Sequence, residues 1–175
     1  KKIEVIGNVV IFHDSMVLSV LDSSATKFVF TGSFIPEKNI LALLQAFLRL
    51  KDFIRVELHL FGDGPLRNEI LDFIQKNLLS DFIFVHGKIN NYELLQKLSH
   101  FHFGVISSLT ENFNVSGIEF LGNGLPVVST PCGGPNEYIN SHNGIITNDF
   151  SSDSIFDGMY KLVNNKFYDR QSILN

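Results

Sequence analysis

Several features that would point to particular protein classes are missing from this sequence. It contains one cysteine, Cys132, and no tryptophan. A single cysteine cannot form an internal disulfide, which fits a reducing compartment. The densest apolar stretch, residues 40–50, is interrupted by Gln45 and Arg49 and is too short to cross a membrane. We recognise no secretory signal peptide. These absences predict a cytoplasmic protein.

An excess of charge of one sign is also missing. The chain has 14 Lys and Arg against 18 Asp and Glu, a net charge of −4, and no dense basic run, which argues against a nucleic-acid groove. Its histidines are not grouped with Cys132 or carboxylates at ligand spacing, and no Asp-x-Asp pair occurs, so we expect no metal site. Neither G-x-G-x-x-G nor a Walker-type phosphate loop is present.

What the sequence does contain is enough apolar material for one domain with a substantial core. Apolar residues make up 45% of the 175 positions, and 17 of them are phenylalanine. This composition argues against disorder and predicts a core rich in phenylalanine.

Short apolar runs alternate with segments of helical spacing along most of the chain. The expected strands are residues 27–32, 55–62, 81–87, 102–107, 125–130 and 144–147. The expected helices are 39–50, a segment opened by Pro65, 91–98, 115–122 and 154–163, with a helical turn at 135–139. Alternation of this kind predicts an α/β fold with a doubly wound parallel sheet, similar to a Rossmann fold, which binds ligands beyond the carboxyl ends of its strands.

The most informative loop follows the fourth expected strand and reads SSLTENFNVSGIE. A helix that begins near Asn114 would point the amides of Asn114, Val115 and Ser116 at a phosphate. Glu111 and Glu119 would lie about 12 Å apart on a continuous helix, which exceeds the roughly 5–9.5 Å of a glycosidase pair. That spacing favours a grip on both ends of an elongated ligand. The alternative is a helix-dipole partner and an ordinary helical glutamate.

Two further loops fit a ligand site less specifically. GSFIPEKN places Lys38 at a helix start, where a lysine could contact a phosphate or simply be solvated. GDGP contains Gly62 and Gly64, which would let the backbone approach a ligand or only form a tight turn.

Five segments taken in order resemble one family. GSFIPEKN, GDGP, VHGKINNYELLQKL, SSLTENFNVSGIEFLGNGLPVVST and CGGPNE are similar to the C-terminal domain of retaining glycosyltransferases with the GT-B fold, called glycosyl transferases group 1 or family 4. The resemblance covers about residues 27–163. It implies an inter-domain connection and N-terminal extension at 1–26, a Rossmann-like nucleotide-sugar-binding domain at 27–164 and a C-terminal tail at 165–175. With the opening KKIEVIGNVVIF, which lacks Met, it also suggests a domain cut from a longer protein, with the N-terminal acceptor domain absent.

The resemblance also assigns roles to individual residues. Glu111 and Glu119 match the two glutamates of the family's E-x7-E motif, of which the first approaches the donor sugar and the second contacts the ribose. Lys38 matches a lysine that contacts the donor diphosphate. Asn114 and Val115 match positions whose backbone amides hold that diphosphate.

Other matches concern the walls of the family's cleft. Val85 matches the strand end that frames the base. The turns that contain Gly62 and Gly64, and Gly133 and Gly134, match the glycine turns that border the cleft.

One departure affects the expected charge of the site. After Gly32 the family usually has an arginine, but this chain has Ser33, which removes a cation expected to stabilise the leaving diphosphate. Lys88 or Arg67 would have to replace it.

The resemblance implies a hexosyltransferase that uses a nucleoside diphosphate sugar, with retention and without a metal or other cofactor. Glu111 and Lys38 would serve catalysis, and the acceptor would be a glycan or lipid-linked molecule, as in surface polysaccharide or lipopolysaccharide biosynthesis. The absent domain would contact the acceptor and could place the protein at the inner face of the membrane. Two alternatives stay open: a nucleotide-sugar 2-epimerase of the same fold, and a non-catalytic module that partners an active transferase.

Overall fold

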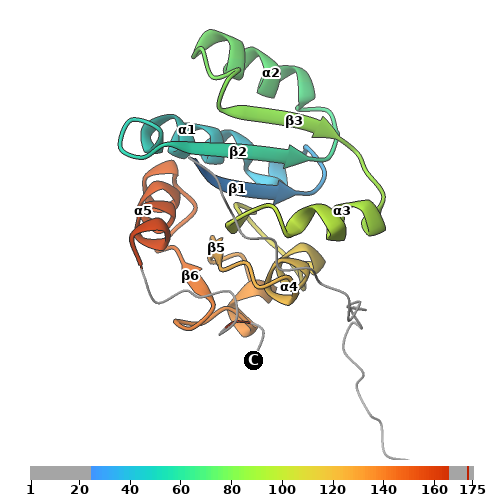
Figure 1. The fold of residues 1–175 in the computed structure, drawn as a ribbon, viewed down its shortest axis with the longest axis vertical. Helices are drawn as coiled ribbons and strands as arrows, with labels where there is room; N and C mark the ends of the chain where they lie inside the picture. The colour runs from blue at the N-terminus through green and yellow to red at the C-terminus, as the bar shows by residue number, and fades with distance from the viewer. Residues whose placement is uncertain (1–24, 166–172, 174–175) are drawn as a thin grey trace, which may run out of the picture.

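The computed structural model describes residues 25–165 and residue 173 (Figure 1). The expected inter-domain connection, apart from its last two residues, and most of the expected tail lie outside these residues. The strands are β1 (Thr26–Thr31), β2 (Val56–Phe61), β3 (Ile83–Gly87), β4 (Phe103–Ile106), β5 (Val127–Ser129) and β6 (Gly144–Ile146). The α-helices are α1 (Ile40–Leu50), α2 (Arg67–Lys76), α3 (Asn91–Leu98), α4 (Val115–Gly122) and α5 (Ser152–Asn164), and two 3-10 helices are η1 (Pro36–Lys38) and η2 (Gly134–Glu137).

All six strands form one parallel sheet in the order β3-β2-β1-β4-β5-β6. Phe28 of β1 pairs with Leu58 of β2 on one side and with Phe103 of β4 on the other, so the chain reverses its direction of growth between β1 and β4. A reversal of this kind opens a crevice at the carboxyl ends of the two strands. The predicted doubly wound, Rossmann-like sheet is therefore confirmed.

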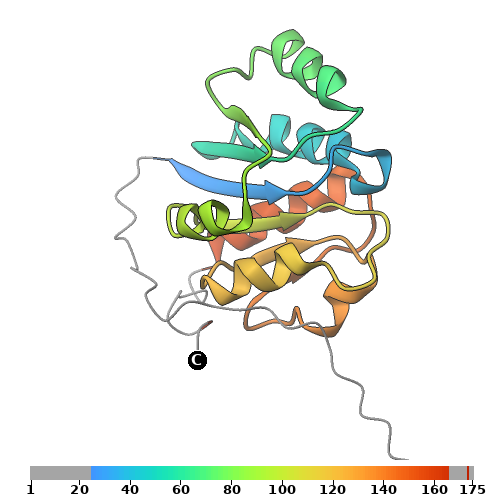
Figure 2. The same ribbon diagram turned by 90° about the vertical axis from the view of Figure 1, so that its right-hand side faces the viewer.

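Helices cover both faces of the sheet (Figure 2). α1, α2 and α5 pack on one face, where Phe28, Phe30, Leu58 and Leu60 point into the larger apolar cluster. α3 and α4 pack on the other face over a smaller cluster that includes Val29. Because neighbouring strand residues face opposite sides, the continuous apolar runs of β1 and β2 supply both clusters.

The helix after β2 begins later than its sequence predicts. Pro65 does not open α2; Leu66 is the N-cap and Arg67 is the first helical residue. The backbone N–H of Leu66 donates to the carbonyl of Phe34 in the loop after β1, at 3.0 Å. This contact holds the GDGP turn against the neighbouring loop, and the helix begins at Arg67 instead of Pro65.

Two general expectations can be compared with the described residues. Within them, no helix combines the length and apolarity that a membrane span requires. The same residues contain no cluster of three or more His, Cys, Asp or Glu side chains arranged to hold a metal ion.

Candidate functional site

The crevice between β1 and β4 is closed at its base by contacts between the two loops that follow these strands. The Ser107 hydroxyl donates to the Lys38 carbonyl at 2.7 Å, and the backbone N–H of Leu109 donates to the Glu37 carbonyl at 2.8 Å. These bonds fix the end of η1 against the loop after β4. Lys38 and Glu111, which are 73 residues apart in sequence, therefore meet at the point where the strand order reverses.

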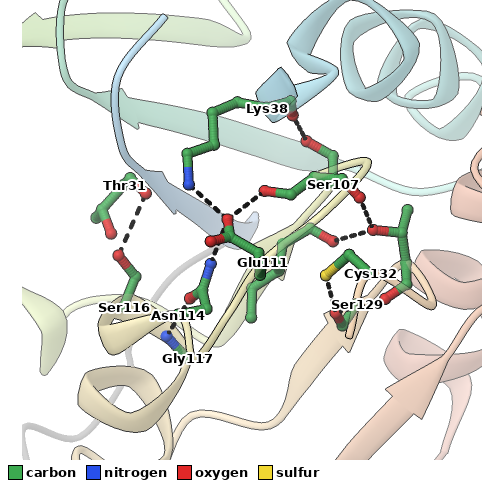
Figure 3. A network of polar contacts seen from close by, with 12 residues as sticks. Thr31, Lys38, Ser107, Glu111, Asn114, Ser116, Gly117, Ser129 and Cys132 are labelled. Atoms are coloured by element: carbon green, nitrogen blue, oxygen red, sulfur yellow. Dashed lines mark hydrogen bonds and ion pairs between the residues drawn. The ribbon is translucent and has the colours of Figure 1, made fainter. Parts of the chain in front are cut away.

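Glu111 is the centre of a polar network (Figure 3). Its Oε1 accepts hydrogen bonds from Lys38 Nζ at 2.5 Å, Ser108 Oγ at 2.6 Å and Asn114 Nδ2 at 2.9 Å. The described part of the chain provides no hydrogen bond to Oε2. One oxygen of the carboxylate is thus held by three donors, and the other can accept from a ligand.

The surroundings of Glu111 keep it ionised at neutral pH. Burial acts to raise the pKa of its carboxyl, but the hydrogen bonds from Lys38, Ser108 and Asn114, together with the Lys38 charge, outweigh burial and lower it. A carboxylate in this state accepts hydrogen bonds and stabilises positive charge, and it is poorly suited to act as a general acid.

The start of α4 is also fixed by Asn114. This residue has left-handed backbone angles, φ 62° and ψ 86°, and its side chain caps the helix by accepting from the Gly117 N–H at 2.8 Å. The Tyr138 hydroxyl donates to the Asn114 carbonyl at 3.0 Å. It reaches that carbonyl because Gly117 has no Cβ, which would stand 2.2 Å from the hydroxyl oxygen. The first α4 amides are thereby fixed in direction.

A pocket of about 260 Å³ opens beside this network at the carboxyl ends of β1, β2 and β3. Its wall includes Thr31, whose hydroxyl is buried and has no hydrogen-bond partner among the described residues. Ser116, at the start of α4, also lines it and donates to the Thr31 carbonyl at 3.3 Å. The complete lining comes from the ends of β1 and β2 with the loops that follow them, the loop after β3, α3 and the start of α4: Thr31, Gly32, Ser33, Phe61, Gly62, Asp63, Lys88, Ile89, Leu94 and Ser116.

The glycine positions predicted for the site fall into two groups. Gly32 and Gly62 line the pocket, and a Cβ on Gly62 would stand 1.8 Å from the Gly32 carbonyl oxygen, so no side chain fits there. Gly133 forms an isolated parallel bridge with Glu111, and the Gly134 N–H donates to the Glu111 carbonyl at 3.0 Å. The second pair therefore holds the backbone of Glu111.

Four predicted residues belong neither to the pocket wall nor to the network around Glu111. Glu119 is 5% exposed, and burial raises its pKa against a side-chain hydrogen bond with Asn91 of α3. Val85 lies within β3 and packs against the larger core cluster. Gly64 packs under the Phe34 backbone. Val115 exposes 46% of its surface at the first turn of α4. Their expected contacts with a nucleotide stay predictions.

Some residues of the site are not identified by the sequence reasoning. Ser108 and Tyr138 both bond to the Glu111–Asn114 network, and Ile89 lines the pocket. Ser108 has a usable signal, because it follows a buried strand directly. Tyr138 has none, because its contact joins elements that only the tertiary fold brings together.

The order of the sheet and the polar crevice define a Rossmann-like domain of the kind that forms the C-terminal half of GT-B glycosyltransferases. Residues 25–165 match the profile of the family described as "Glycosyl transferases group 1", and the chain belongs to this family. An uncharacterized glycosyltransferase of Methanocaldococcus jannaschii is 30% identical over 139 residues, which are 79% of this chain and 38% of that protein. The alpha-monoglucosyldiacylglycerol synthase of Streptococcus pneumoniae is 29% identical, with 71% of this chain and 26% of that protein covered.

Solved structures agree on the fold. The apo form of the lipopolysaccharide outer core galactosyltransferase WaaB superposes with a TM-score of 0.81 at 18% identity, over 92% of this chain and 47% of that chain. The C-terminal domain of a glycosyl transferase group 1 family protein (LpcC) of Francisella tularensis gives a TM-score of 0.74 at 17% identity, over 86% of this chain and 82% of that chain. The chain thus spans well under half of the curated relatives and most of an isolated C-terminal domain.

Proposed function

We propose that this chain is the donor-binding domain of a retaining glycosyltransferase that moves a hexose from a nucleoside diphosphate sugar to a glycan or lipid-linked acceptor. The observation that carries the proposal is the convergence of Lys38, Asn114 and Glu111 at the β1–β4 crevice. The pocket next to it has room for part of a nucleotide. A relative of known fold, the pneumococcal O-GlcNAc transferase GtfA, was solved in complex with UDP and GlcNAc, at 20% identity and a TM-score of 0.75.

The chemistry requires stabilisation of an anion. When the bond between the sugar and the β-phosphate breaks, negative charge develops on the diphosphate. Lys38 and the amides at the start of α4 would stabilise that charge, and the domain would need no metal ion for this purpose. Glu111 would orient the sugar through its Oε2, while its Oε1 stays bonded to the protein. Glu119 would leave Asn91 and accept from the ribose hydroxyls.

For the acceptor and its pathway we propose surface polysaccharide or lipopolysaccharide biosynthesis, with the acceptor bound by a further domain at the inner face of the membrane. The S. pneumoniae relative is named as a glycolipid synthase and the WaaB structure as a lipopolysaccharide galactosyltransferase, which supports an acceptor of this class.

Calorimetric titration of the chain with UDP, GDP and ADP tests the proposal. We expect selective binding of one nucleotide, and a loss of affinity of about tenfold or more for Lys38→Ala and for Glu119→Ala, since each removes a charged or strongly hydrogen-bonding group from the ligand. Asp81→Ala, at an exposed position before β3, is the control and should bind as the native chain does. Failure of all three nucleotides to bind would contradict the proposal and favour a non-catalytic module.

A further inference from the structure

The pocket wall carries two charged side chains, Asp63 and Lys88. Asp63 is engaged by the protein: its Oδ1 accepts from the Gly64 N–H at 2.8 Å and lies 3.8 Å from Arg67 Nη1. Lys88 directly follows β3, is exposed, and forms no hydrogen bond or ion pair within the described residues. Its ammonium group is therefore free to reach a ligand in the pocket.

The other nearby lysine is already paired with a carboxylate. A Cβ on Gly32 would stand 3.7 Å from Lys38 Cε, so this side chain runs beside the pocket. Its Nζ, however, is 2.5 Å from Glu111 Oε1, so the carboxylate offsets part of its charge. Ser33, also on the pocket wall, is neutral. Among the described residues, Lys88 is thus the cation of the pocket wall whose charge no carboxylate offsets.

We propose that Lys88 is a second phosphate-binding cation of the site and forms an ion pair with the diphosphate of the bound nucleotide. The inference rests on the function proposed above. Lys88 shares the pocket wall with the polar side chains of Ser33 and Ser116. A lysine on a flexible stem suits this role because it needs no fixed geometry to pair with a phosphate.

Arg67 is the other cation that could act here, and its position argues against it. It is not part of the pocket wall, and its Nη1 lies next to Asp63. Contact with a phosphate would require it to leave that carboxylate. Lys88 faces no such competition.

The test compares nucleoside diphosphates with nucleosides. Calorimetric titrations of the 175-residue chain would use UDP, GDP and ADP, and in parallel uridine, guanosine and adenosine, on the native chain and on Lys88→Met, Lys88→Arg and Lys76→Met. Lys76 is the matched control. It is the last residue of α2, the helix that starts at the pocket side of the sheet, so it lies at the far end of that helix, and Lys76→Met removes the same charge.

We expect Lys88→Met to weaken binding of the preferred diphosphate about tenfold, and more at low salt, because a charge-assisted contact is lost. Nucleoside affinity should change less than twofold, Lys88→Arg should retain most of the affinity, and Lys76→Met should behave as the native chain. The thermal midpoint of Lys88→Met should equal that of the native chain.

Two results would overturn the inference. One is an unchanged diphosphate affinity in Lys88→Met. The other is a loss of nucleoside affinity as large as the loss of diphosphate affinity, which would place Lys88 beside the nucleobase. Failure of the native chain to bind any nucleotide would instead overturn the proposed function.

Discussion

At the scale of single residues, the two glutamates predicted for the site are in opposite electrostatic states. Glu111 has a lowered pKa because three donors and the Lys38 charge stabilise its anion. Glu119 has a raised pKa because it is buried with one amide partner, Asn91, and no cation. The first carboxylate stabilises the fold as an anion, whereas the second destabilises it at neutral pH. A buried carboxylate that lowers stability fits the binding role proposed for Glu119.

Removal of Lys38 should show how strongly the protein depends on the Glu111 pair. We expect Lys38→Met to lower the free energy of unfolding by about 1–3 kcal/mol, because a largely buried carboxylate loses a charged donor. Because the folded pKa of Glu111 is lowered, its contribution is present above the ordinary pKa of a carboxyl and is lost as pH falls through the folded value. The difference between native chain and variant, measured by urea unfolding, should therefore shrink in acid.

The control for this prediction is Lys51→Met. The Lys51 ammonium lies 2.7 Å from Asp52, whose side chain is 66% exposed. This exposed pair should contribute about 1 kcal/mol or less. Equal losses for the two variants would show that the Glu111 network is no stronger than a surface ion pair.

Substitution Glu119→Gln should have the opposite effect on stability. The raised folded pKa of Glu119 means that its carboxyl favours folding below its ordinary pKa, and that this contribution is lost as pH rises through the folded value. A neutral amide removes the cost of burying the anion. We expect a higher thermal midpoint than the native chain at pH 8, with the two converging near pH 4. A midpoint below that of the native chain at pH 8 would contradict this reading of the burial.

At the scale of elements, the start of α4 is the part of the site that depends most on one residue. Asn114 supplies the left-handed backbone angles, the cap to Gly117 and a bond to Glu111. A substitution by alanine should lose the cap, about 1 kcal/mol, and add a left-handed penalty of about 1–2 kcal/mol. Asn114→Gly should lose less, because glycine adopts the left-handed region freely. Urea unfolding of both variants gives the comparison.

Asn90→Ala is the matched control for the α4 cap. Asn90 caps α3 by accepting from the Glu93 N–H at 2.9 Å, but its φ is −73°. Its replacement by alanine should lose the cap alone, about 1 kcal/mol. If Asn114→Ala and Asn90→Ala are destabilised equally, the left-handed conformation carries no measurable cost.

The spacing of apolar residues predicted the helices and strands well, and the errors come from tertiary contacts that the spacing does not reveal. The helix over residues 115–122 and the strand run at 27–32 follow from apolar spacing, and both are observed within one residue. The start of α2 could not be predicted, because the Phe34 carbonyl that holds Leu66 comes from a loop 32 positions earlier in the chain. The meeting of Lys38 with Glu111 required the strand order, which spacing alone does not determine. The resemblance to family motifs predicted that Lys38 and Glu111 belong to one site, but it did not predict the contact of Tyr138.

At the scale of the whole molecule, the domain contains the groups proposed to bind the donor on one edge of one sheet. The loops after β1, β2, β3 and β4 all reach this edge, and two apolar clusters on opposite faces of the sheet hold it in place. Donor binding should therefore be a property of residues 25–165. We do not expect the same of acceptor binding, because the chain spans only 38% of the M. jannaschii relative.

This division predicts that the chain binds a nucleotide but does not transfer sugar. A nucleotide at 100 times its dissociation constant should stabilise the fold by about 2.7 kcal/mol, which a thermal shift assay would detect as a saturable rise in midpoint. Under the same conditions, incubation with the matching nucleoside diphosphate glucose or galactose and a lipid acceptor should yield no glycosylated product. Transfer requires an acceptor held next to the anomeric carbon of the sugar, and proximity of that kind is worth several orders of magnitude in rate. Product formation by these 175 residues would show that the acceptor site lies within this chain.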